Sequence, residues 1–174
     1  MEVASRLQLT QEGLALGALL RSHRVVLEEV EIQLQQEVGL SFPLYEALAT
    51  LAMAPEQRLR MVDVTRRMCV SKSNVTQLID KLERQQLVSR ELSPTDRRLV
   101  YALLTERGRK AAEKGTEIFN RVANECFAQF MTKGEIEKVA GGLTKVTAAL
   151  EPDSIVSATS KESLMNGKRS GSHG

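Results

Sequence analysis

Residues 64–83 decide the fold, and they read VTRRMCVSKSNVTQLIDKLE. Residues 62–68 predict a short helix, and Ser71 is a suitable N-cap for a second helix after a tight turn. In that second helix, apolar residues recur at the i, i+3, i+4 and i+7 positions of one face: Val75, Leu78, Ile79 and Leu82. The sequence therefore predicts two helices joined by a turn, the second with one apolar and one polar face.

A β-hairpin is expected after these helices. Residues 87–92 and 99–104 have strand-like content, and Ser93-Pro94-Thr95-Asp96 between them has the Pro and Asp of a type I turn. The tip is polar and mostly basic, because two arginines follow Asp96. Residues 59–61 predict a further short strand or extended entry. This order of elements is that of a helix-turn-helix followed by a wing.

The charge distribution suggests a polyanionic partner. Residues 56–109 carry twelve Lys/Arg against seven Asp/Glu, whereas residues 12–37 carry two against five. A basic middle beside an acidic flank favours one surface built for nucleic acid. The polar face of the second helix would enter a DNA major groove, while its apolar face holds it on the domain.

The predicted DNA contacts follow from the chemistry of the side chains. Asn and Gln suit adenine, Lys and Arg suit guanine or phosphate, and hydroxyls near a helix N-terminus suit phosphate. We expect Arg84 to neutralise Asp80 four residues before it, and Asp96 to hold one wing arginine through a bidentate pair. The candidate DNA-binding residues are Ser71, Lys72, Ser73, Asn74, Thr76, Gln77, Lys81, Arg84, Asp96, Arg97 and Arg98.

Further helices are predicted on both sides of this unit. Thr10 can cap a first helix that runs to about Val38, before Gly39. Its seam has gaps of four and three: Leu16, Leu20, His23, Leu27, Val30 and Leu34. Because this helix is longer than a small domain needs, we expect its seam to pack on another subunit. A second helix should start near Ser41 and Pro43 and end at Ala54-Pro55.

The C-terminal part of the sequence also predicts helices. Thr105 can cap a fifth helix whose apolar pairs continue to Phe130 and Met131. Thr132-Lys133-Gly134-Glu135 is a capping box that opens a sixth helix through Leu150. Residues 151–174 are rich in Ser, Gly and small polar residues and predict a flexible C-terminal tail.

The fold class that follows is mainly α with a small β-hairpin, with about six helices and two to three short strands. Residues 41–104 are predicted to form a winged helix-turn-helix DNA-binding domain. Residues 10–38 and 105–150 are predicted to form a helical dimerisation region. The core must be aliphatic, because only 3% of the 174 residues are aromatic.

Several of these segments resemble the MarR family of regulators. Residues 64–83 look like that family's helix-turn-helix, and residues 40–45 with Leu48 match the opening of its second helix. Asp96-Arg97-Arg98, followed by Leu104-Thr105 and Gly108, matches its wing signature. The resemblance covers about residues 14–150.

The resemblance implies a triangular homodimer in which the first, fifth and sixth helices interlock with their partners. The two recognition helices would read a pseudo-palindromic operator in double-stranded DNA. Asp96 and Arg98 would form the wing-tip pair, with Arg98 in the minor groove. We therefore expect a sequence-specific transcriptional regulator, acting as a repressor that a small effector releases.

Two positions depart from the family pattern, which often has Gly where this chain has Cys69 and Gln86. If those turns need a positive φ, each side chain costs on the order of 1 kcal/mol. Cys69 also follows Arg66 and Arg67 and precedes a helix N-terminus, features that lower the pKa of a thiol. A redox-sensing role for Cys69 stays open beside the alternative that it fills a turn.

The resemblance also implies an aromatic or phenolic anion bound between the dimer helices and the DNA-binding lobe. The candidate effector-binding residues are Arg21, His23, Arg24, Phe42, Tyr45 and Leu48. A satisfied interface histidine is the alternative for His23, and surface or interface ion pairs are the alternative for the two arginines.

The sequence lacks the residue patterns that other classes of function require. The sequence has no visible nucleophile–base set, no phosphate-binding Gly loop and no His/Cys cluster, so we expect no enzyme activity, no metal and no cofactor. No apolar run approaches a membrane span, and the N-terminus lacks a signal-peptide pattern, so a cytoplasmic protein is expected. A helical protein–protein adaptor without DNA binding is the remaining alternative.

Overall fold

A computed structural model describes residues 9–68, 72–96 and 98–150. These residues form six α-helices, two short 3₁₀ helices and one three-stranded antiparallel sheet of order β1-β3-β2. The helices are α1 (Gln11–Val38), α2 (Phe42–Ala52), α3 (Met61–Arg67), α4 (Lys72–Arg84), α5 (Glu106–Cys126) and α6 (Lys133–Leu150). The strands are β1 (Arg58–Arg60), β2 (Val88–Leu92) and β3 (Val100–Leu104), and the 3₁₀ helices are η2 (Pro55–Gln57) and η3 (Ala128–Phe130). The predicted fold class is confirmed.

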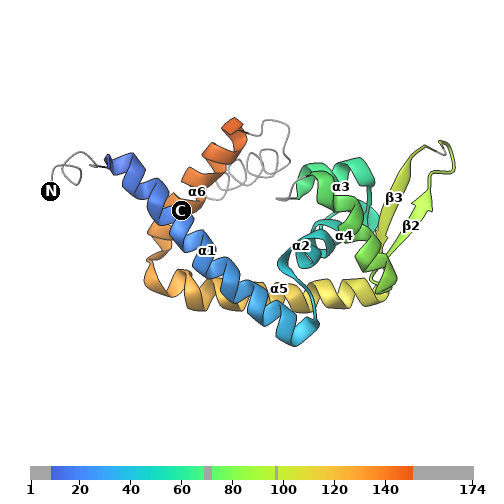
Figure 1. Ribbon diagram of the computed structural model, residues 1–174, viewed down its shortest axis with the longest axis horizontal. Coiled ribbons are helices and arrows are strands. Elements are labelled where there is room, and N and C mark those ends of the chain that lie inside the picture. The colour runs from blue at the N-terminus through green and yellow to red at the C-terminus, as the bar shows by residue number, and fades with distance from the viewer. Residues whose placement is uncertain (1–8, 69–71, 97, 151–174) are drawn as a thin grey trace, which may run out of the picture.

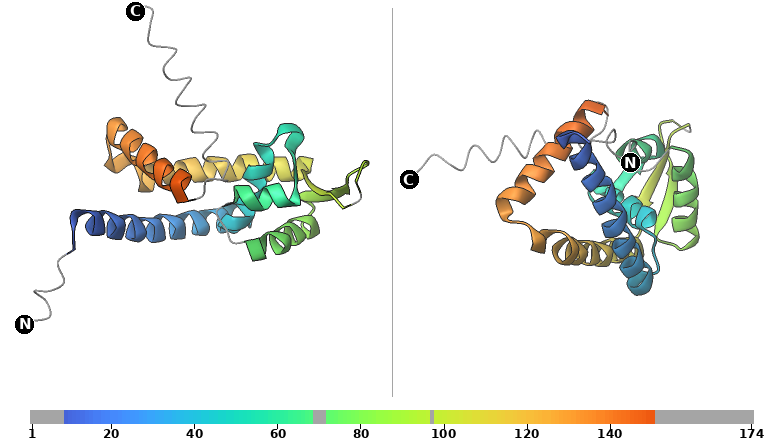
Figure 2. Two further views of the ribbon diagram at one scale, coloured as in Figure 1. Left: turned by 90° about the horizontal axis from the view of Figure 1, so that it is seen from above. Right: turned by 60° about the vertical axis from the view of Figure 1, so that its left-hand side comes forward.

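The molecule has a lobe at one end and long helices that extend from it. Figure 1 shows α2, α3, α4 and the sheet gathered at one end of α5, while α1 packs on α5 and extends away from the lobe. In the right-hand view of Figure 2, α1, α5 and α6 outline a triangle. No helix in the described ranges is long and apolar enough to cross a membrane. Residues 151–174, the predicted tail, lie outside the described part.

One aliphatic core holds the lobe together and sets the orientation of α4. Val75, Ile79 and Leu82 of α4 are buried against α2, α3 and the sheet, as the spacing predicts. Full burial of such a side chain contributes about 1.5–3 kcal/mol. A second cluster joins α1, α2 and α5 through Val30, Leu34, Tyr45, Ile118 and Val122. The lobe is thereby tied to the long helices.

The first two helices begin and end where the local chemistry indicates, with one exception. The Thr10 hydroxyl accepts a hydrogen bond from the Gly13 amide (3.2 Å), and Gly39 ends α1 in the left-handed region. Ser41 stands at the N-cap of α2 but makes no side-chain capping bond. Instead, the Phe42 amide donates to Oε2 of Glu31 on α1 (2.5 Å). A carboxylate from another helix therefore satisfies the start of α2.

The hairpin strands form within one residue of their predicted positions, but the predicted turn does not close across Ser93–Asp96. The Leu99 amide donates to the Asp96 carbonyl (2.9 Å), and within the described residues no backbone hydrogen bond joins Asp96 to Ser93. Ser93 acts through its side chain, whose hydroxyl accepts from the amides of Thr95 (3.3 Å) and Asp96 (3.4 Å). A serine hydroxyl can replace a backbone acceptor in this way.

The joint between the hairpin and α5 explains the Leu104-Thr105…Gly108 pattern. The Thr105 hydroxyl accepts from the Gly108 amide (2.9 Å) and donates toward the carbonyls of Gln86 (2.8 Å) and Leu87 (3.0 Å). A Cβ on Gly108 would lie 1.9 Å from the Leu87 carbonyl oxygen. Only glycine lets α5 approach the start of β2 so closely.

The fifth helix is shorter in the structure than the sequence predicts. It ends as an α-helix at Cys126, because Phe127 has φ −132° and ψ −63°, and η3 replaces the expected continuation to Met131. The capping box is confirmed: the Thr132 amide donates to Oε2 of Glu135 (2.8 Å), and the Glu135 amide donates to the Thr132 hydroxyl (3.4 Å). The hydrogen bond from the Thr132 hydroxyl holds the pKa of Glu135 below its usual value.

Gln86 occupies the left-handed region (φ 59°), as its place in the family pattern suggested. It ends α4 in a Schellman arrangement, in which the Leu87 amide donates to the Leu82 carbonyl and the Gln86 amide to the Glu83 carbonyl. Glycine adopts this conformation without steric cost. The side chain of Gln86 is exposed, so its removal takes nothing from the core.

We therefore expect Gln86→Gly to raise the free energy of unfolding by about 0.5–1 kcal/mol. Thermal unfolding at equal protein concentration would measure the gain as a higher Tm. Gln85→Gly is the matched control, since Gln85 has no positive φ and should lose stability. A Gln86→Gly protein that melts earlier than the wild type would contradict the strain argument.

Candidate nucleic-acid interface

The polar face of α4 is presented to solvent. Burial of Val75, Ile79 and Leu82 turns the other side of the helix outward, and five of the predicted residues on that side are exposed. These exposed residues are Asn74, Thr76, Gln77, Lys81 and Arg84. The amides and cations on this face are the groups that can read base edges or bind phosphates.

Four of these side chains line one shallow hollow. Asn74, Gln77, Lys81 and Arg84, together with Leu78 and Pro43 from α2, surround about 340 Å³. In the described residues, Lys81 has no ion pair and Arg84 uses only its Nε, which donates to the Asp80 carbonyl (3.3 Å). The structure thus gathers two amides and two cations whose outer hydrogen-bonding groups are available to a ligand.

A second hollow separates α4 from the wing. Its volume is about 440 Å³, and Thr76 and Asp80 of α4 lie on one side of it, with Arg98 on the other. Arg60 of β1 and Arg90 of β2 also line it. The predicted recognition helix and the predicted wing arginine therefore flank the same concave surface.

Arg90 connects the wing to α4, and the predicted Arg84–Asp80 ion pair is wrong. Arg90 lies 2.5 Å from the Asp80 carboxylate and 2.9 Å from that of Glu83. Its side chain is 25% exposed, so solvent screens these pairs less than at an open surface. Two acids three residues apart on α4 thus meet one cation from the sheet, and the angle between helix and wing is held by this contact.

Asp96 holds the backbone at the wing tip. Its Oδ1 accepts a hydrogen bond from the backbone amide of Arg98 (2.9 Å), and the predicted bidentate bond is not made by the Arg98 guanidinium, while Arg97, the other predicted partner, lies outside the described residues. Such an Asx turn is the local geometry that Asp favours at a loop tip. Asp96 therefore fixes the backbone at the wing tip, and the Arg98 side chain, which is exposed, stays available.

Some predicted site residues cannot be placed. Ser71, Arg97 and Cys69 lie outside the described residues, while Lys72 and Ser73 are the first two residues of α4. Within the described ranges, no three His, Cys, Asp or Glu side chains form a group that could hold a metal ion.

Sequence reasoning missed Arg60 and Arg90. The signal for Arg90 was present in the strand period, because residues 88, 90 and 92 share one face and Val88 is buried. Arg60 is exposed, and a hydrogen bond with Tyr101 raises its pKa further above its usual value. It therefore adds a permanent positive charge beside Arg98.

The predicted effector residues divide into two groups. Phe42 and Tyr45 of α2 stack on Phe119 of α5, with ring centroids 6.3 and 5.9 Å from that ring. Leu48 is fully buried in the core of the lobe. Arg21, His23 and Arg24 are exposed on α1, and Arg24 pairs with Glu28 (3.8 Å). None of the six lines either of the two hollows beside α4.

Known proteins share this arrangement. Residues 38–99, which span α2 to the wing, match the profile of the MarR family. The uncharacterised HTH-type transcriptional regulator YhbI of Bacillus subtilis (strain 168) is 30% identical over 124 residues, which cover 70% of this chain and 74% of that protein.

Solved structures have the same fold. Sco3205, a MarR family transcriptional regulator from Streptomyces coelicolor solved with DNA, has a TM-score of 0.77 at 23% identity and covers 83% of this chain and 91% of its own. The organohalide-sensing regulator RdhR, solved with 2,4-dichlorophenol, has a TM-score of 0.72 at 19% identity and covers 83% of this chain and 84% of its own. Together with the match to YhbI, the family profile shows that this chain belongs to the MarR family of transcriptional regulators.

Proposed function

We propose that the protein binds a specific operator in double-stranded DNA as a homodimer and represses transcription there. The observation that carries this proposal is that Thr76 of α4 and the wing residue Arg98 flank one concave surface, while the polar-face residues Asn74, Gln77, Lys81 and Arg84 line a second hollow on the same helix. The solved complex of Sco3205 with DNA supports the choice of ligand.

The roles of the side chains follow from groove chemistry. Asn74 and Gln77 would read adenine, whereas Lys81 and Arg84 would bind guanine or phosphate. Arg98 would enter the minor groove, where a narrow groove concentrates negative potential. Arg60, which lies in the hollow between α4 and Arg98, would add a phosphate contact. Lys72 and the hydroxyls of Ser71 and Ser73, which the sequence also predicted as DNA contacts, would bind phosphates at the start of α4.

Homodimer formation is supported by apolar surface that this chain leaves uncovered. No residue of α6 is buried, although Ile136, Val139, Leu143, Val146 and Leu150 recur at gaps of three and four. On α1 the first half is also exposed, with Leu20 at 61% and Leu16 at 56%. Contiguous apolar stripes of this kind are normally covered by a partner. A second copy supplies the same stripes, and a two-fold dimer would present two α4 helices about one helical turn of DNA apart.

Leu143→Glu should weaken the dimer, because a carboxylate in the centre of the α6 stripe would have to be desolvated on association. We expect the dimer dissociation constant to rise by at least about tenfold, measured by light scattering over a dilution series. Lys145→Glu introduces the same side chain away from the stripe and should leave the dimer intact. A monomeric wild-type protein would remove this part of the proposal.

Lys81→Ala should weaken DNA binding evenly across sequences. If Lys81 neutralises one phosphate, the slope of log Kobs against log salt concentration should become shallower by about one unit. Fluorescence anisotropy with the DNA that flanks the protein's own gene would measure it, after footprinting has located the operator. An unchanged slope would exclude the phosphate contact.

A complete absence of salt-dependent DNA binding by the wild-type protein would instead favour the alternative, a helical protein–protein adaptor. The same fragment and a shuffled duplex of equal length separate specific from general binding. Equal affinity for both at every salt concentration would contradict sequence-specific recognition.

An aromatic or phenolic effector is part of the same proposal. Phe42, Tyr45 and the half-exposed Phe119 form an aromatic cluster between the lobe and the long helices, and RdhR was solved with a chlorophenol. Arg21 and Arg24 would supply the positive charge, and His23 a hydrogen bond, if the dimer brings a partner's α1 to this cluster. Tyr45 bonds Thr116 (3.3 Å), so an effector that displaces this bond would move α2 against α5.

A further inference from the structure

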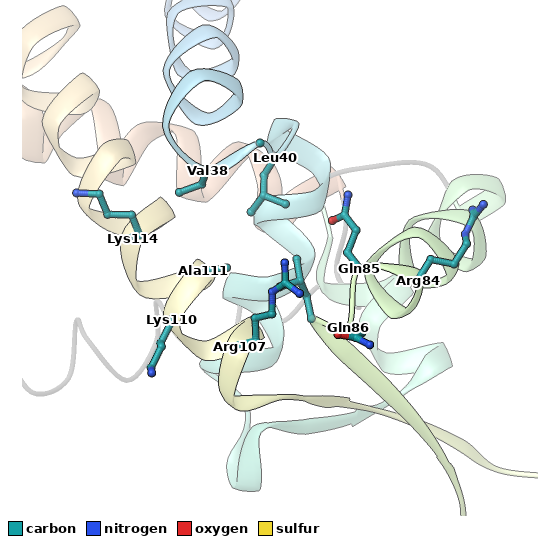
Figure 3. Close-up of a pocket in the computed structure, with 11 residues that line it drawn as sticks. Val38, Leu40, Arg84, Gln85, Gln86, Arg107, Lys110, Ala111 and Lys114 are labelled. Atoms are coloured by element: carbon teal, nitrogen blue, oxygen red, sulfur yellow. The ribbon is translucent and has the colours of Figure 1, made fainter.

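A third hollow, larger than the two beside α4, lies at the end of that helix, where it shares Arg84 with the polar face, and none of its lining belongs to the aromatic cluster. It measures about 600 Å³, a size typical of small-molecule sites. Three segments meet there: the α1–α2 link, the turn between α4 and β2, and the first half of α5 (Figure 3). Its lining comprises Val38, Gly39, Leu40, Arg84, Gln85, Gln86, Leu87, Arg107, Lys110, Ala111 and Lys114.

The lining carries positive charge only. It includes Arg84, Arg107, Lys110 and Lys114 and no acid. The three cations of α5 recur at gaps of three and four and so form one stripe along that helix. Lys110 and Lys114 pair with Glu106 (3.9 Å) and Glu117 (2.9 Å) on the flanks of the stripe, but these are exposed pairs that contribute little.

Arg107 differs from its neighbours, because it has no ion pair or hydrogen bond within the described residues. Figure 3 places its side chain between α5 and the turn that holds Gln86, whereas Lys110 extends away from that turn. A planar guanidinium with free donors is suited to a bidentate bond with a carboxylate or phosphate. The side-chain amides of Gln85 and Gln86 can donate to the same oxygens.

The rest of the hollow is apolar. Leu40 and Leu87 are buried at its base, and Val38 and Ala111 are partly buried beside them. Inorganic ions gain nothing from such a wall, whereas an organic acid with a short hydrocarbon or aromatic body can cover it. Charge and shape together define the chemical class of ligand.

We propose that this hollow is a second ligand site, which binds a small organic acid with its carboxylate on Arg107 and its apolar body against Leu40 and Leu87. Because Arg84 ends α4 and Gln85 and Gln86 follow it, a bound acid touches the end of the recognition helix. The regulatory part of this proposal rests on the proposed function. Binding of the acid changes the protein's affinity for DNA, and binding of DNA changes its affinity for the acid by the same factor.

The test uses the full-length protein without DNA and isothermal titration calorimetry at constant ionic strength. The probes are sodium 3-phenylpropionate, the neutral 3-phenylpropanamide of the same shape, and sodium phosphate. We expect saturable binding of the carboxylate, binding at least about tenfold weaker for the amide, and no comparable binding of phosphate. Failure of the carboxylate to saturate, or phosphate bound as tightly, would overturn the proposal.

Two variants locate the site. Arg107→Gln should lower the affinity for the carboxylate by about tenfold or more. Arg109, two residues along α5, pairs with Glu106 and Glu113, so Arg109→Gln should change that affinity by no more than about twofold. Circular dichroism would verify that both fold. Amide chemical shifts should change at residues 84–87 and 107–114. Changes centred instead on Phe42 and Tyr45, or equal affinity in Arg107→Gln, would refute this location.

Operator titrations with and without saturating 3-phenylpropionate test the regulatory part. The wild type should change its DNA affinity by several-fold and Arg107→Gln should not. An unchanged wild-type affinity would overturn the coupling. Calorimetric binding in a protein that never binds DNA would instead reject the proposed function and leave the ligand site standing.

Discussion

Replacing Arg98 with alanine is expected to lower the affinity for the operator by about 10- to 100-fold, corresponding to roughly 1–3 kcal/mol. The side chain is exposed on the wing and lines the hollow beside α4. Its own backbone amide, and not its guanidinium, is held by Asp96. The substitution therefore removes the proposed DNA contact and leaves the bond between the Arg98 amide and Asp96 in place.

Fluorescence anisotropy at one fixed salt concentration measures this loss, and circular dichroism verifies the fold. Arg98→Lys keeps the charge but not the planar fork, so it should recover only part of the affinity. Arg109→Ala removes an equal charge from α5, where the arginine pairs with Glu106 and Glu113, and should have little effect. Wild-type affinity in Arg98→Ala would exclude the wing from the interface.

Gly108→Ala is expected to lower the free energy of unfolding by about 2–3 kcal/mol, the upper range for an overpacked site. The new Cβ would lie 1.9 Å from the Leu87 carbonyl oxygen, which is backbone and already accepts bonds from Thr105. Relief requires that α5 move away from β2, and that motion breaks the Thr105 bonds.

Thermal unfolding at equal protein concentration should show a fall in Tm of roughly 4–12 °C. Gly134→Ala is the control, because a Cβ on Gly134 meets nothing within 4 Å. An unaltered Tm in Gly108→Ala would mean that the close approach of α5 to β2 relaxes freely.

The sequence predicted those features that depend on neighbours along the chain. The caps at Thr10, Thr105 and Thr132, the end of α1 before Gly39 and the buried face of α4 all follow from patterns of a few residues, whereas the positive φ of Gln86 was suggested by the family pattern. The hairpin strands were recognisable for the same reason, because turn residues separate two apolar runs.

The errors concern contacts between distant segments. Asp80 selects Arg90, ten residues away on a strand, over Arg84 on its own helix, because the β2 register turns Arg90 toward α4. The start of α2 is capped by Glu31, eleven residues before Phe42. The extra length given to α5 came from an apolar pattern that continues through η3 without helical backbone angles at Phe127.

The candidate site was predictable in composition and only partly in geometry. The helix pattern identified the exposed residues of α4, and the wing signature identified Arg98. Arg107 could not be recognised as distinct, because along the sequence it is one of several basic residues in a charged helix. Its lack of a partner emerges only once α5, the α1–α2 link and the α4 turn meet.

The hydrogen bond between Glu31 and the Phe42 amide couples movements of α1 to the lobe. A rotation of α1, such as a change in how two copies cross, would pull on the first turn of α2. Pro43 follows Phe42 directly and forms part of the hollow that Asn74 and Gln77 line. The spacing between two recognition helices and the shape of each reading surface would then change in one movement, so this carboxylate would transmit subunit geometry to the proposed base contacts.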